Sequence, residues 1–269
     1  MVYKRYGQVF NQIRNQKHLP LSFFESVGIN KSSLQRFETG QTMMGFERLD
    51  AALQAMNVTL GEYEYFLNYF QAGYLEEIVD EVIGNIYVRN TNRLQLIAQE
   101  CKESNQMILY HACRSSFEEL DEDSVEIIAS YLYDIEQWGY FELSIFFISM
   151  ECFSERTIMH LMNDFWNKAK EMYGVFKYRR RFLETSYKAI IHLSKLGYKN
   201  SVDSIIKQSY FSDQVYDMYC ENLRRIALGF YKQSFIKVEE GRKEWEKSCQ
   251  LFEEFGHIEL ARYYKLILQ

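Results

Sequence analysis

Apolar side chains recur at intervals of three and four along most of the chain, the periodicity of an α-helix with one buried face. In the first 70 residues this pattern predicts five short helices, at 6–17, 23–27, 31–39, 46–57 and 60–70. Ser22, Asn30 and Thr59 stand where a side-chain oxygen can cap a first helical turn. Gly28 follows the second helix, at a position that favours a left-handed backbone. Two short helices joined by a glycine turn have the spacing of a helix-turn-helix.

The third predicted helix has two chemically different faces. Leu34 and Phe37 lie three positions apart and face inward, together with Val27 and Ile29. The outward positions are polar or cationic, namely Lys31, Ser32, Ser33, Gln35 and Arg36. Side chains of these types can reach guanine, adenine or phosphate from within a major groove. The alternative is an ordinary solvated helix face.

From about residue 71 the predicted helices are longer and have wider apolar faces. Four segments repeat a large apolar residue, a glycine and a nearby ring, at 138–143, 196–201, 228–233 and 255–260. We expect each glycine to end a helix packed between antiparallel neighbours. Positions 139, 197, 229 and 256 are 58, 32 and 27 residues apart, which fits a degenerate two-helix repeat of the tetratricopeptide kind. Such glycines can also end helices in any α-protein.

The composition agrees with an all-α fold, because the chain has one proline and 13 glycines. We therefore predict an N-terminal five-helix helix-turn-helix domain at 1–68 and a degenerate tetratricopeptide-like helical-repeat domain at 69–269. The most apolar stretch, at 141–153, is interrupted by Glu142 and Glu151. Neither a secretion signal nor a membrane span is expected.

Charge is distributed unevenly along the chain. Residues 1–40 contain six cations and two acids, which gives them a charge of +4. Since the whole chain has a net charge of -6, the other 229 residues carry -10. A basic head on an acidic body is typical of a DNA-binding module joined to a domain of another kind. Chance clustering of the cations is the alternative.

Candidate reactive residues are scattered. The five cysteines form no CxxC pair and are odd in number, which indicates reduced thiols in a cytoplasmic protein. The histidines at 18, 111, 160, 192 and 257 are isolated, and there is no phosphate-binding glycine loop or nucleophile elbow. We expect neither an enzyme nor a bound cofactor or metal.

The segment INKSSLQRFETG, residues 29–40, resembles the recognition helix of Cro/repressor-type helix-turn-helix domains. More narrowly, the stretch at 6–24 followed by KSSLQRFETG is similar to the Rgg/GadR/MutR family of streptococcal and lactobacillar transcriptional regulators. The body resembles that family at YLYDIEQWGYFELSIFF and at FEEFGHIELARYY. The resemblance covers almost the whole chain.

The resemblance implies a homodimer that binds double-stranded promoter DNA and senses a short hydrophobic peptide pheromone in its C-terminal repeats. It also implies that Arg14 and Glu38 pair, so Arg14 is a candidate both for phosphate contact and for helix packing. Some relatives carry an interchain disulfide after the recognition helix. This chain has QTMMGFERL there and lacks the cysteine.

A peptide groove needs polar partners for the peptide backbone and carboxylates, with apolar pockets beside them. The segment at 173–193 places Tyr178, Arg181, Thr185 and Lys188 on one helix face. The candidate peptide-binding residues are Tyr178, Arg181, Thr185, Tyr187, Asn222 and Arg225. A solvated basic face is the alternative for each, and most aromatic residues are expected in the core.

Three functions fit these patterns. The leading one is a DNA-binding regulator controlled by a peptide. The second is a helical-repeat interaction scaffold without ligand-controlled DNA binding. The third retains DNA binding but uses the body only for dimerisation.

Overall fold

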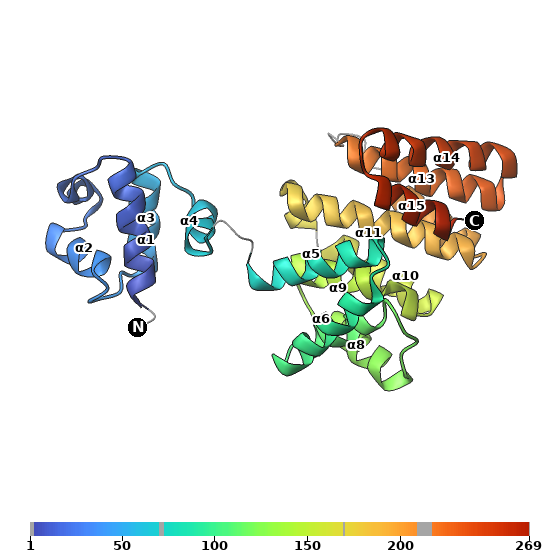
Figure 1. Cartoon of the computed structure of the whole chain (residues 1–269), viewed down its shortest axis with the longest axis horizontal. Helices are drawn as coiled ribbons and strands as arrows, with labels where there is room; N and C mark the ends of the chain where they lie inside the picture. The colour runs from blue at the N-terminus through green and yellow to red at the C-terminus, as the bar shows by residue number, and fades with distance from the viewer. Residues whose placement is uncertain (1–2, 70–72, 169, 209–216, 269) are drawn as a thin grey trace. The chain divides into compact units, whose positions relative to one another are not determined.

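The computed structural model describes residues 3–69, 73–168, 170–208 and 217–268. These residues form helices and connecting turns without a β-strand, which confirms the predicted all-α class. The chain divides into two compact units, residues 1–77 and 78–269 (Figure 1). The predicted domain boundary at 68/69 falls between the last helix of the first unit and the helix that follows it.

The first unit contains five short elements and the start of a sixth. They are α1 (Tyr3–Gln16), the 3-10 helix η1 (Leu21–Val27), α2 (Lys31–Glu38), α3 (Phe46–Ala55) and α4 (Leu60–Leu67). The cap expected at Ser22 is wrong, because η1 begins at Leu21 after Pro20 and includes the serine. The caps at Asn30 and Thr59 are confirmed: each side chain accepts a backbone N–H from the first turn of its helix.

The core of the first unit is built around aromatic rings. Phe10 of α1 lies 5.5 Å from Phe24 of η1 and 5.7 Å from Phe37 of α2, measured between ring centroids. Leu34 is completely buried beside them. Gly7 allows α1 to approach α2 closely, because a Cβ there would lie 1.8 Å from the carbonyl oxygen of Phe37. The inward face predicted for α2 is confirmed, and it holds the outward face in place.

The second unit is a succession of longer helices. Its elements are α5 (Tyr74–Tyr87), which begins just before it, α6 (Thr91–Glu103), α7 (Met107–Arg114), α8 (Glu122–Asp134), α9 (Tyr140–Ser149), η2 (Met150–Cys152), α10 (Glu155–Lys168), η3 (Lys170–Gly174), α11 (Phe176–Lys195), α12 (Lys199–Gln208), α13 (Met218–Phe235), α14 (Val238–Glu254) and α15 (Ile258–Ile267). Helix α11 packs on both α9 and α13, and α13 pairs with α14. Figure 1 shows α13, α14 and α15 stacked after α11.

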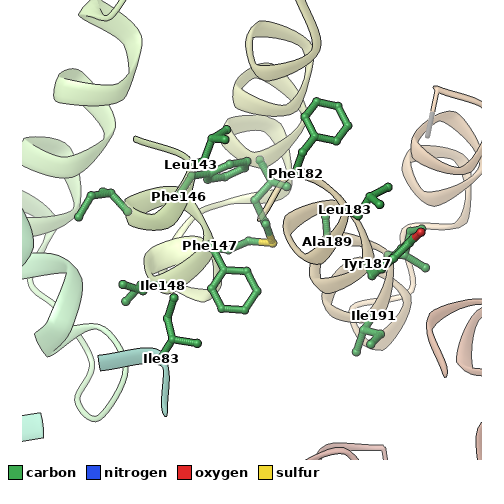
Figure 2. Packing of buried hydrophobic residues seen from close by; sticks show 14 of the residues in the cluster. Ile83, Leu143, Phe146, Phe147, Ile148, Phe182, Leu183, Tyr187, Ala189 and Ile191 are labelled. Atoms are coloured by element: carbon green, nitrogen blue, oxygen red, sulfur yellow. The ribbon is translucent and has the colours of Figure 1, made fainter. Parts of the chain in front are cut away.

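Helices α9 and α11 supply the centre of the core. In Figure 2, Phe147 and Ile148 extend from α9 on the side of Ile83, while Leu183 and Ile191 project from α11. The predominance of apolar residues on α9 is explained by its position, since every residue from 143 to 149 is buried.

Two of the four glycines expected to end helices do so. Gly197 and Gly256 follow α11 and α14 with φ of 83° and 84°. The expectation for Gly139 is wrong, because it precedes α9 and its N–H is capped by Glu142. The expectation for Gly229 is also wrong, because it lies buried inside α13. There its missing side chain allows α14 to approach, since a Cβ would lie 2.8 Å from the backbone nitrogen of Trp245.

Candidate functional site

The outward face of α2 is accessible and positively charged. Lys31, Ser32, Gln35 and Arg36 are exposed, and Ser33 is half-buried. The Asn30 side chain caps the helix at 2.8 Å from the backbone N–H of Ser33. Only loose contacts restrain the cations: Lys31 lies 3.9 Å from Glu25, and Arg36 Nε donates to its own helix at 3.3 Å. These five side chains thus form an accessible polar strip, which we call the α2 strip.

Arg14 is directed inward, away from the α2 strip. Its Nε and Nη2 donate to the two carboxylate oxygens of Glu38 at 2.6 and 2.9 Å, and its Nη1 donates to the carbonyl oxygen of Leu19. Asn11 also donates to Glu38. The pairing implied by the family resemblance is therefore confirmed. The paired Glu38 carboxylate raises the pKa of Arg14.

Three predicted peptide-binding residues lie inside the packing of α11. Arg181 donates to Glu184 at 2.8 Å and to the hydroxyl of Tyr140 at 2.9 Å, and its guanidinium lies over the ring of Phe147. Thr185 is fully buried and donates to the carbonyl oxygen of Arg181. Tyr187 is also buried. Arg181 thus links α11 to α9, and Thr185 and Tyr187 are enclosed in the core.

The other three occupy different environments. Asn222 is buried and donates to the carbonyl oxygen of Ser248 on α14. Arg225 is exposed and pairs with Glu221 of its own helix at 3.1 Å. Tyr178 is half-buried, with its ring 6.0 Å from that of Tyr140. None of the six predicted residues lines either of the two cavities described next.

Two adjoining cavities open in the second unit, with volumes of about 380 and 270 Å³. They share four lining residues, Glu151, Lys188, Tyr263 and Ile267, and we call them together the groove. Ile86 and Tyr87 at the end of α5 form part of its wall, and residues of α11 form another part. Helix α15 closes another side, where the ring of Tyr263 lies 5.1 Å from that of Tyr87.

One ion pair lines both cavities of the groove. Lys188 Nζ donates to the carbonyl oxygen of Phe147 at 2.9 Å and lies 3.2 Å from the carboxylate of Glu151. The charge of Lys188 is the main cause that lowers the pKa of Glu151. Arg89, His192 and Lys195 also line the groove. The groove therefore combines apolar walls with an excess of positive charge.

The sequence contained a signal for one groove residue. Lys188 shares a helix face with Arg181 and Thr185 in the predicted pattern, and the cavities lie at the end of α11 that contains Lys188, Ile191 and Lys195. Glu151 and Tyr263 reach the groove from elements distant in the chain, and helical periodicity carries no information about such contacts.

Within the described ranges, no three His, Cys, Asp or Glu residues gather in a way that could hold a metal ion. No described helix has both the length and the apolarity needed to cross a bilayer.

Comparison with known proteins completes these observations. Residues 88–266 match the family model "HTH-type transcriptional regulator Rgg, C-terminal domain". Among solved structures, the fold matches the SHP pheromone receptor Rgg2 of Streptococcus dysgalactiae, with 19% identity over 97% of each chain and a TM-score of 0.79. A protein from Listeria monocytogenes EGD-e matches with 18% identity, over 99% of this chain and 96% of that one, with a TM-score of 0.78. A receptor from a bacterial peptide pheromone/receptor complex matches with 13% identity, over 98% and 97% of the two chains, with a TM-score of 0.62.

At these identities the structural matches show the fold, while the family model covers more than half of the chain. The chain belongs to the Rgg family of helix-turn-helix transcriptional regulators.

Proposed function

We propose that this protein is a sequence-specific DNA-binding regulator whose activity is controlled by a short hydrophobic peptide. DNA binding is assigned to residues 1–68, and peptide binding and dimerisation to residues 69–269. The observation that carries the proposal is the α2 strip, an exposed cationic face on a capped helix whose other face is locked into a core.

In this proposal the α2 strip enters a major groove. Lys31 and Arg36 supply phosphate or guanine contacts, and Ser32, Ser33 and Gln35 read neighbouring base edges. Arg14 acts indirectly, because it holds Glu38 and so fixes the orientation of α2. A homodimer would present two such helices to two half-sites.

The peptide part of the proposal rests on the groove. Two of the matched structures are of pheromone receptors, and cavities of this combined size are typical of ligand sites. Of the six residues first expected to bind peptide, we propose that Arg181, Thr185, Tyr187 and Asn222 support the surrounding helices, since all four are buried. Tyr178 and Arg225 do not line the groove and are not buried, so they stay candidates for contact with a part of the peptide that extends beyond it.

The DNA assignment is tested by replacing Arg36 with alanine. We expect weaker binding to promoter duplex and a salt dependence reduced by about one unit of slope, because one phosphate or guanine contact is lost. The matched control is Arg242→Ala, which removes another exposed arginine, from α14. Equal affinity of Arg36→Ala and wild type at matched salt would remove Arg36 from the site.

The competing functions give different results in the same binding assay. A chain that shows no salt-sensitive preference for any duplex, including its own upstream region, would be an interaction scaffold. A chain that binds its promoter but no hydrophobic peptide in calorimetry would be a regulator without a ligand. Peptide binding in the groove should give a negative heat-capacity change, since apolar surface is buried.

A further inference from the structure

We propose that the groove selects an apolar peptide that carries a carboxylate, and that Arg89 and Lys195 hold this carboxylate beside the Lys188–Glu151 ion pair. The inference rests on the proposed peptide-binding function and names the chemistry that the groove recognises.

The charges of the groove are not balanced. Arg89, Lys188 and Lys195 line it together with a single carboxylate, Glu151. Lys188 is already satisfied by Glu151 and by the carbonyl oxygen of Phe147. Arg89 and Lys195 are exposed, and neither side chain makes a hydrogen bond or ion pair within the described parts of the chain. Two cations at the groove are therefore available to a ligand.

Arg89 lines the first cavity and Lys195 lines the second, and the Lys188–Glu151 ion pair lines both. Partial loss of solvent around its ammonium group lowers the pKa of Lys195 most, and the charges of Arg89 and Lys188 lower it further, against the opposing effect of Glu151. Repulsion of this kind is relieved when an anion binds between like charges. A carboxylate would also accept charge-assisted hydrogen bonds, which are stronger than neutral ones.

The apolar walls of the groove favour a carboxylate that is part of an apolar molecule. Ile86, Phe117 and Ile148 line the first cavity, and Phe147 and Ile191 line the second. A small hydrated anion would leave this apolar surface uncovered, whereas a hydrophobic peptide would cover it and present a carboxylate to the cations. The carboxylate can come from the C-terminus of the peptide or from an acidic side chain.

Three synthetic pools of short peptides of Leu, Ile, Val, Phe and Gly distinguish these sources. One pool has free C-terminal carboxylates, one is amidated, and one is amidated with a single internal Asp. Each pool is incubated with full-length protein, and retained peptides are identified by mass spectrometry after gel filtration. We expect at least one carboxylate-bearing pool to be retained roughly tenfold better than the neutral pool. The better retained of the two carboxylate-bearing pools shows whether the groove binds a C-terminal carboxylate or an acidic side chain.

The double variant Arg89→Met/Lys195→Met should lose this preference and still retain neutral peptides. The charge-conserving variant Arg89→Lys/Lys195→Arg should keep the preference for carboxylate-bearing peptides. The matched control is Lys199→Met/Arg242→Met, which removes two cations from exposed ion pairs outside the groove. Circular dichroism checks that each variant is folded.

Three results would overturn the inference. Equal retention of all three pools would overturn it and leave the proposed peptide function standing. Retention of no pool would overturn both. A preference that persists in the Arg89→Met/Lys195→Met variant would also overturn it, because the carboxylate would then bind elsewhere.

Discussion

Glu38 shows how one buried carboxylate determines where a neighbouring cation can act. It accepts hydrogen bonds from Arg14 and Asn11, with 5% of its side chain exposed. Arg14 is thereby committed to helix packing, while Arg36, in the last turn of α2, is exposed to solvent. Two arginines of the same unit thus have separate roles.

Glu38→Ala should strongly destabilise the first unit. The substitution leaves the Arg14 guanidinium buried without its partner, which costs about 3–5 kcal/mol in comparable sites. The measurement is urea unfolding of the full-length protein, with hydrogen exchange followed in α1 and α2. The exposed pair Lys31–Glu25 provides the control, since Glu25→Ala should change stability by less than about 1 kcal/mol. Similar effects of the two substitutions would contradict the structural role given to Glu38.

Two histidines of the second unit should make its stability depend on pH. Burial lowers the pKa of both His111 and His192 below the usual 6.5. Between the lowered pKa and 6.5, the unfolded chain binds more protons than the folded chain, so stability decreases as the pH falls through this range. It should be fully present above about pH 6.5.

The double variant His111→Gln/His192→Gln should show a flatter decrease of unfolding free energy with falling pH. Each histidine accounts for at most about 1.4 kcal/mol per pH unit. Urea unfolding at a series of pH values measures the slope, and comparing slopes removes any constant loss of stability caused by the glutamines. Identical slopes would show that neither histidine is linked to folding.

Single residues were predictable where their role is local. The caps at Asn30 and Thr59 and the inward position of Leu34 follow from contacts within a few residues of the chain. The Lys188–Glu151 pair was not predictable, because its partners are 37 residues apart in the chain. Glu151 lies in η2, which follows α9, and the two residues meet because α9 packs on α11.

At the scale of elements, the pair α13 and α14 depends on two glycines that face each other. A Cβ at Gly241 would lie 2.1 Å from the backbone nitrogen of Gln233 and 2.5 Å from the carbonyl oxygen of Gly229. Both obstacles are backbone atoms, so a side chain at Gly241 would push the helices apart. A glycine that permits close helix packing cannot be distinguished by sequence from a glycine that ends a helix. The sequence therefore predicted a helix end at Gly229, which lies inside α13.

Gly241→Ala should destabilise the second unit by about 1–3 kcal/mol, the usual cost of overpacking. Gly84→Ala is the matched control, because this glycine lies in α5 and a Cβ there would meet no atom within 4 Å. In that helix alanine should stabilise by about 0.4–1 kcal/mol. Thermal unfolding followed by circular dichroism compares them, and effects of the same sign would contradict the close contact.

At the scale of the whole chain, the groove is assembled from distant segments. Ile86 and Tyr87 come from the first helix of the second unit, Lys188 from its middle, and Tyr263 and Ile267 from its last helix. The fold class could be predicted because helical periodicity is local. The groove could not, since it depends on how the first and last helices of the unit meet.

Deleting residues 258–269 should therefore abolish peptide retention. The deletion removes Tyr263 and Ile267 from the groove and exposes the surface on which Leu260 and Tyr264 are buried. Gel filtration with the peptide pools measures retention, and circular dichroism measures the remaining helix. Unchanged retention by the shortened chain would place the ligand outside the groove.

The contact between Tyr87 and Tyr263 also has a consequence for protein synthesis. During translation, α5 emerges from the ribosome long before α15, so its side of the groove stays uncovered until α15 has been synthesised. A nascent or prematurely terminated chain would present a complete α2 strip without a complete groove. In the proposed function, only chains that contain α15 would therefore respond to peptide.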